Sequence, residues 1–86
     1  MRKKFIKRIR RYLLKNGGHI TLIDPIVIPV EYRRKVRCII EYDSDNYLIL
    51  ATGKTEYSAY RNLYNHVKAA EMINKYLEAK RCITQQ

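Results

Sequence analysis

The spacing of apolar residues changes at Asn16-Gly17-Gly18, and this change separates a helical pattern from a strand pattern. Before the glycine pair, apolar residues recur every three or four positions, as on one face of an α-helix. These residues are Phe5, Ile6, Ile9, Tyr12 and Leu13. Glycine readily adopts the left-handed conformation that ends a helix, and the charge of Lys15 suits a last helical turn. We therefore predict a helix of about three to four turns that stops at Asn16-Gly17-Gly18.

After the glycine pair the pattern alternates with a period of two and is rich in β-branched residues. Residues 19–32 read HITLIDPIVIPVEY, and one alternating set in this stretch is Ile26, Ile28, Val30 and Tyr32. Such alternation predicts a strand with one packed face. Pro25 and Pro29 lack the amide donor of a strand ladder, so we expect this strand at a sheet edge, or broken by a bulge.

Two further strands are predicted before the last third of the chain. The second begins after a turn at Arg33-Arg34-Lys35 and places one apolar set on one face, namely Val36, Cys38, Ile40 and Tyr42. Asp43-Ser44-Asp45-Asn46 is a strong turn signal, because short Asx and Ser side chains hydrogen-bond to their own backbone. The third strand is expected over Tyr47 to Thr52.

A long second helix is predicted after Gly53. Thr55 is the expected N-cap, and Glu56 lies in the first turn, where its charge complements the helix dipole. The apolar stripe consists of Tyr60, Leu63, Tyr64, Val67, Ala70, Ile73 and Leu77. A helix of about 25 residues is roughly 37 Å long, twice the length of a six-residue strand. Part of it must therefore extend past the sheet.

These elements predict one α+β domain over residues 1–86 with the order α-β-β-β-α. Three antiparallel strands form a meander, and two amphipathic helices cover one of its faces.

The basic amino terminus is not followed by a continuous apolar segment, so neither a signal peptide nor a membrane span is expected. We expect an intracellular, cytoplasmic protein that has no membrane partner.

Positive charge is concentrated at the amino end. The formal net charge is +10, and residues 1–23 contain eight basic and no acidic residues. Like charges four residues apart on a helix repel one another, which favours a polyanion as partner. The residues that we expect to contact nucleic acid here are Lys3, Lys4, Lys7, Arg8 and Arg11. The alternative is a solvated helix face that keeps a small domain soluble.

A second basic cluster follows the first predicted strand and comprises Arg33, Arg34, Lys35 and Arg37. The planar guanidinium of arginine suits a loop that contacts phosphates. The alternative is a charged turn that prevents association between sheet edges.

The eight tyrosines allow two interpretations as well. Exposed rings can stack on bases, whereas most are expected at the boundary of the core, with the ring packed and the hydroxyl in water.

No catalytic, metal or cofactor site is expected. Cys38 and Cys82 lack CxxC spacing, and His19 and His66 have no serine, carboxylate or second ligand at a usable distance in sequence. We therefore expect a binding protein and not an enzyme.

The order of the elements resembles the double-stranded-RNA-binding fold and its relatives among the HicA-type toxins. Residues 47–59, YLILATGKTEYSA, stand where that family has its third strand, glycine-lysine loop and second helix. The resemblance implies Lys54 and Arg61 as nucleic-acid contacts. Where that family has a lysine pair at the helix start, this chain has Glu56-Tyr57-Ser58. Residues 37–62 are also similar to the hairpin and helix start of the HicB antitoxins, without the proline-bearing segment of that family.

The expected function is nucleic-acid binding, mainly to backbone phosphates and hence with weak sequence specificity, with DNA and RNA both open. The alternative is a protein-interaction module, such as a toxin-antitoxin component or an accessory protein of a phage or mobile element. In that case the long last helix or the edge strand meets a partner. We also expect a homodimer through Ile73, Tyr76 and Leu77, unless the first helix covers them.

Overall fold

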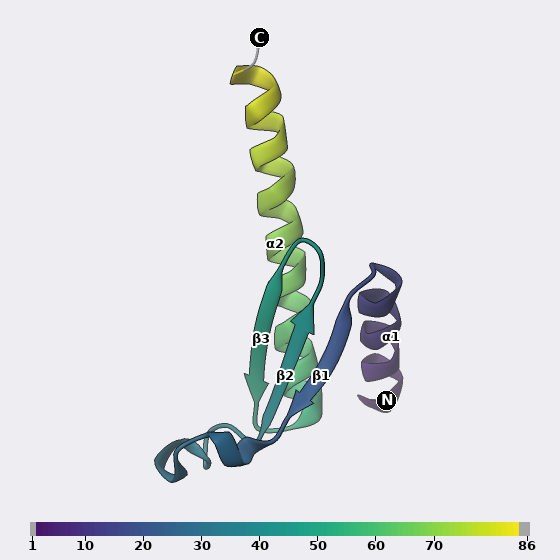
Figure 1. Cartoon of the computed structure of the whole chain (residues 1–86). Coiled ribbons are helices and arrows are strands. Elements are labelled where there is room, and N and C mark those ends of the chain that lie inside the picture. The colour runs from purple at the N-terminus through teal and green to yellow at the C-terminus, as the bar shows by residue number, and fades with distance from the viewer. Residues whose placement is uncertain (1, 85–86) are drawn as a thin grey trace.

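The computed structural model describes residues 2–84, which form two helices and one sheet (Figure 1). The elements in chain order are α1 (Arg2–Lys15), β1 (His19–Ile23), the 3-10 helices η1 (Pro25–Val27) and η2 (Val30–Tyr32), β2 (Cys38–Asp43), β3 (Leu48–Gly53) and α2 (Glu56–Thr84). The strands are antiparallel and lie in the order β1-β2-β3. The predicted α+β class and α-β-β-β-α order are confirmed.

Both helices pack on one face of the sheet, as predicted. Opposed residues of antiparallel strands share a face, so Ile40 shares this face with its partners Leu22 and Ala51. Tyr42 lies on the same face. The buried core joins these strands to both helices and consists of Ile9, Leu13, Ile40, Tyr42, Ala51, Ala59, Tyr60, Leu63 and Val67. Apolar side chains of α1 and α2 thus replace water over this face.

The other face of the sheet is not covered by a helix. Alternation along β2 places Glu41 and Asp43 there, and their partners on β3 are Leu50 and Leu48. Both leucines are exposed, and Asp45 follows in the adjoining turn. Within residues 2–84, the sheet therefore separates a face with two carboxylates and two exposed leucines from the layer that contains the basic helix α1.

The predicted strand over residues 26–32 is wrong. β1 ends at Ile23, and the two prolines stand at the start of 3-10 helices, Pro25 in the first position of η1 and Pro29 as the N-cap of η2. The Asp24 carboxylate accepts a hydrogen bond from the Ile26 amide at 3.0 Å. Proline fixes its own φ and cannot donate to a ladder, so local turns form although the apolar residues alternate. The expected edge position holds for β1.

The remaining strands lie close to their predicted positions. β2 begins at Cys38 instead of Val36, and β3 is shifted by one residue from the predicted Tyr47–Thr52. The turn between them closes where it was predicted, because the Ser44 amide donates to the Tyr47 carbonyl at 2.9 Å.

Gly17 and Gly18 end α1 as predicted. Gly17 has φ +82°, its amide donates to the Leu14 carbonyl at 3.1 Å, and the Gly18 amide donates to Leu13 at 3.4 Å. This pair of bonds is the Schellman arrangement that satisfies the last carbonyls of a helix. Gly18 is buried against the ring of Tyr42, and a Cβ at this position would overlap that ring.

α2 begins and extends as predicted. The Thr55 hydroxyl accepts a hydrogen bond from the Ser58 amide at 3.1 Å, which is the expected N-cap. The helix has 29 residues, and Figure 1 shows its carboxyl-terminal half beyond the turn between β2 and β3. The radius of gyration is 15.4 Å, compared with about 12 Å for a compact domain of this length. Within residues 2–84, neither helix has the uninterrupted apolar length that a bilayer crossing needs.

Candidate nucleic-acid interface

The predicted contact residues of α1 lie on its solvent side. Ile9 and Leu13 anchor the helix in the core, and this orientation leaves the opposite face in water. The cations named from the sequence are all exposed, namely Lys3, Lys4, Lys7, Arg8 and Arg11, and Arg2, Arg10 and Lys15 are exposed as well. Arg10 is used differently, because its guanidinium donates to the Tyr60 hydroxyl at 2.6 Å and stabilises the packing of α1 on α2. α1 contains no acidic residue that could neutralise this face.

The predicted basic cluster after β1 is divided between two roles. Arg33 donates from Nε to the Ile28 carbonyl at 3.0 Å and from Nη2 to the Ile26 carbonyl at 3.2 Å. Its guanidinium therefore holds the two 3-10 helices together, and part of its donor capacity is used inside the chain. Arg34 and Lys35 follow on the same projecting segment and are exposed.

Arg37 and Lys54 come together although they are far apart in sequence. The Arg37 amide donates to the Gly53 carbonyl at 3.1 Å, which extends the pairing of β2 with β3 to the residue beside Lys54. Both side chains line a surface depression of about 340 Å³ that also includes Glu56. Burial, with a further contribution from the Glu56 carboxylate, raises the pKa of the Cys38 thiol in the same depression. Glu56 offsets part of the positive charge at this position.

The three basic groups lie towards one end of the domain. In Figure 1 the amino end of α1, the segment between β1 and β2, and the loop from β3 to α2 are all found at the end opposite to the last turns of α2. The structure thus brings Lys3, Lys4 and the two loop groups towards one end, whereas the predicted cations continue along α1 as far as Arg11.

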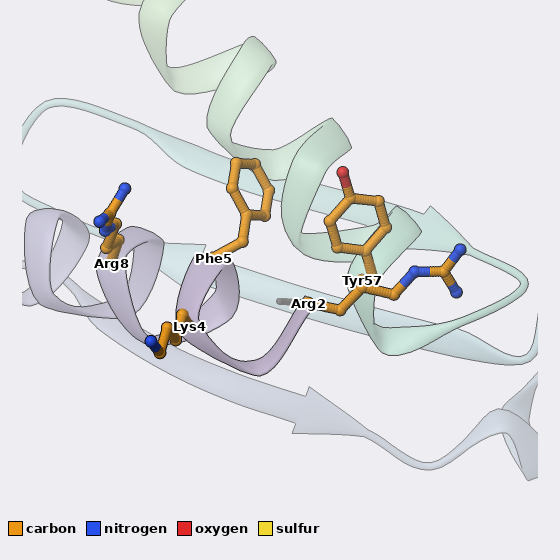
Figure 2. A pocket seen from close by; sticks show the side chains of 5 residues that line it. All are labelled: Arg2, Lys4, Phe5, Arg8 and Tyr57. Atoms are coloured by element: carbon orange, nitrogen blue, oxygen red, sulfur yellow. The ribbon is translucent and has the colours of Figure 1, made fainter.

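The amino-terminal turns of the two helices form a site that the sequence analysis did not identify (Figure 2). A depression of about 430 Å³ is lined by Arg2, Lys4, Phe5, Arg8 and Tyr57. The rings of Phe5 and Tyr57 lie with centroids 5.1 Å apart and planes at 49°. The Arg2 guanidinium carbon lies 5.3 Å from the centroid of the Tyr57 ring. We call this site the Phe5–Tyr57 depression.

This site exists because the two helices run in the same direction. Phe5 contacts Tyr57, and one to two turns further along both helices Tyr12 contacts Tyr64 with ring centroids 5.8 Å apart. The sequence contains eight tyrosines, and nothing local distinguishes Tyr57 from the others.

At the far end of the helix pair, a lysine and a glutamate of α2 form an ion pair beside Tyr12. Lys68 Nζ lies 4.4 Å from the centroid of the Tyr12 ring and 3.7 Å from Glu71 Oε2. The Tyr12 hydroxyl donates to Glu71 Oε1 at 2.6 Å. Glu71 therefore offsets part of the positive charge at this end, whereas no acidic residue lines the Phe5–Tyr57 depression.

Within residues 2–84, the structure assembles no group of three or more His, Cys, Asp or Glu side chains that could hold a metal ion.

Comparison with family models, curated proteins and solved structures finds no match to this chain. The resemblance to double-stranded-RNA-binding and HicA or HicB domains therefore stays an analogy in the order of elements.

Proposed function

We propose that this domain binds nucleic acid, mainly through backbone phosphates. The observation that supports the proposal best is the α1 face, on which every predicted cation is exposed and no acidic residue is present. Lysine and arginine that neutralise phosphates release condensed counterions, and this release supplies affinity with little dependence on sequence. DNA and RNA are both included. The proposal has no catalytic step and no cofactor, and it assigns the protein to the cytoplasm, where such polymers are accessible.

The distribution of charge supports a preferred orientation on the polymer. Glu41, Asp43 and Asp45 belong to the open sheet face and its adjoining turn, whereas in the helical layer the cations of α1 outnumber the glutamates of α2. A field divided in this way turns the helical layer towards a polyanion and the open sheet face away from it. Lys54, Arg37, Arg34 and Lys35 would extend the contact at the end of the domain, with Arg33 holding their segment in shape.

A variant that replaces three cations of α1 with neutral residues tests this function. The triple variant Lys3→Gln, Lys7→Gln, Arg11→Gln changes exposed residues outside the Phe5–Tyr57 depression. Its affinity for a labelled oligonucleotide, measured by fluorescence anisotropy, should fall about ten-fold or more at low salt, and the slope of log K against log salt should become shallower by up to about 0.9 per lost contact.

The control is the variant Lys75→Gln, Lys80→Gln, Arg81→Gln, which has the same net charge but changes the carboxyl-terminal half of α2. Equal losses of affinity in the two variants would show an unspecific effect of net charge and would contradict an interface on α1.

A second candidate function is protein association through α2, and one observation favours it. Beyond the sheet, four apolar side chains of α2 are exposed, Met72 by 71%, Ile73 by 58%, Tyr76 by 64% and Leu77 by 45%. We propose a second copy of the chain as partner, because homodimers with two-fold symmetry match one surface with itself. Lys75 and Glu78 place charges of both signs on this segment. Two copies of the segment would therefore not repel each other through charge of a single sign.

A further inference from the structure

We propose that the Phe5–Tyr57 depression holds one unstacked base of a single-stranded nucleic acid, while Arg2, Lys4 and Arg8 contact the phosphates on either side of it. This inference rests on the nucleic-acid binding proposed above and adds the form of the ligand. It assigns stacking to the two rings and charge neutralisation to the three cations.

The rings leave surface for a planar ligand. Phe5 and Tyr57 are each only partly buried, and their planes are tilted by 49°, so neither ring covers the face of the other. The depression of about 430 Å³ lies within the range of about 300–1,000 Å³ that small-ligand sites occupy. Bases that are not paired stack on aromatic rings and on arginine guanidinium planes in many RNA- and single-strand-binding proteins.

The Arg2 guanidinium lies over one side of the Tyr57 ring, and Lys4 and Arg8 line the same depression from α1. In Figure 2, Arg8 and Lys4 lie along α1 on one side of the ring pair, and the guanidinium of Arg2 lies on the other side, beyond Tyr57. A strand that placed one base on the exposed surface of these rings would meet positive charge both before and after that base. None of the five lining residues is acidic, in contrast to the depressions that contain Glu56 and Glu71.

The site continues along the helix pair. A second depression of about 250 Å³ shares Phe5 and Arg8 with the first and adds Ile9, Tyr12 and Tyr64. A third, of about 340 Å³, shares Tyr57 and adds polar residues of α2, including Arg61. Aromatic rings and cations therefore continue beyond the first depression, with Lys68 over the ring of Tyr12. Sequence-tolerant single-strand binding combines the same two kinds of group.

A duplex cannot use this site in the same way. Its bases are stacked and paired inside the helix, so a duplex meets the domain through phosphates alone. The rings of Phe5 and Tyr57 should therefore contribute to binding of a single strand and contribute little to binding of a duplex.

The test uses three labelled ligands of equal length, a single-stranded oligothymidylate, the same backbone without bases, and a duplex. Tyr57→Leu keeps an apolar side chain but removes the aromatic face, and Tyr47→Leu is the matched control, because Tyr47 is also partly buried but lies in the turn between β2 and β3. Because stacking on one base is worth about five-fold or more in affinity, Tyr57→Leu should weaken oligothymidylate binding by at least that factor. Its affinity for the other two ligands should change less than two-fold, and the salt slope should stay the same.

The sequence contains no tryptophan, so Tyr57→Trp supplies a single reporter in a variant that keeps an aromatic ring. Its fluorescence should be quenched by the oligothymidylate and not by the strand without bases. Equal quenching by both strands, or a Tyr57→Leu variant that binds oligothymidylate like the wild type, would overturn the base site while leaving salt-dependent phosphate binding in place. Absence of salt-dependent binding to all three ligands would instead contradict the proposed function itself.

Discussion

The hydroxyl of Tyr42 donates a hydrogen bond to the carbonyl of Leu13 at 3.0 Å, and this bond joins the middle strand of the sheet to the last turn of α1. Both residues are fully buried. Because the Tyr42 ring also lies against Gly18, the direction in which the chain leaves α1 is fixed by the same side chain. The position of the basic helix over the sheet therefore depends on this contact.

The two glycines after α1 should respond differently to alanine. A Cβ at Gly17 has open space around it, so Gly17→Ala should cost only the strain of a positive φ, about 1–2 kcal/mol. Gly18→Ala introduces overlap with the Tyr42 ring and should cost about 1–3 kcal/mol. Urea unfolding of both variants with and without Tyr42→Leu separates the mechanisms. Removing the ring should relieve the cost at Gly18 by about 0.5 kcal/mol or more and leave the cost at Gly17 unchanged. Additive costs at both positions would contradict the packing of Gly18 on Tyr42.

Stability should decline in alkaline solution, partly through Tyr42. Burial raises the pKa of Tyr42 above its ordinary value of 10.0, and nearby Tyr47 and Glu71 add to the effect. The unfolded chain then loses this proton at a lower pH than the folded protein. The stabilisation is complete below pH 10 and is lost as the pH rises through the folded-state pKa.

Tyr42→Phe provides the comparison for this pH effect. At neutral pH it should cost about 0.5–1.5 kcal/mol through the lost hydrogen bond. Unfolding free energies measured at pH 8 and above pH 10 should converge, because only the wild type loses stability through this hydroxyl. Burial also raises the pKa of Tyr47, so the variant should retain part of the alkaline decline. A constant difference between the two proteins across this range would contradict the assignment.

The exposed half of α2 should mediate self-association. The pair Ile73→Gln, Leu77→Gln removes two exposed apolar side chains at helical spacing without touching the core around Val67. Light scattering should give a dimer mass for the wild type at high micromolar concentration and a monomer mass for the variant, with little change in the stability of the monomer. Tyr57→Leu is the matched control and should not change the mass. A wild-type protein that stays monomeric at this concentration would remove the dimer proposal.

The fold could be predicted where local patterns and packing agree. The apolar stripes of α1 and α2, the Thr55 cap and the glycine stop are local signals, and each of these residues lies where its pattern predicted. The strand predicted after Ile23 does not form, although its apolar residues alternate, because Pro25 and Pro29 have no amide proton to donate to a ladder. Without donors at these positions, hydrogen bonds within the segment replace a ladder.

The candidate site was only partly predictable. Cations off the apolar stripe must face water, so the exposure of Lys7 and Arg11 followed from helical geometry alone. The contact of Phe5 with Tyr57 depends on which way two distant helices run, and a single sequence does not state this. The role of Arg33 was hidden for the same reason, because its two carbonyl partners become neighbours only after the chain between them forms 3-10 turns.

The salt dependence of nucleic-acid affinity tests the central claim most directly. Anisotropy titrations of the wild type with a labelled duplex and a labelled single strand would be repeated at several salt concentrations between 50 and 200 mM, the range over which counterion release changes affinity strongly. If α1 and the neighbouring basic groups neutralise about four to six phosphates, log K should fall with log salt at a slope of about −4 to −5 for the duplex, and somewhat less steeply for the single strand. An affinity that is the same at low and physiological salt would contradict the account.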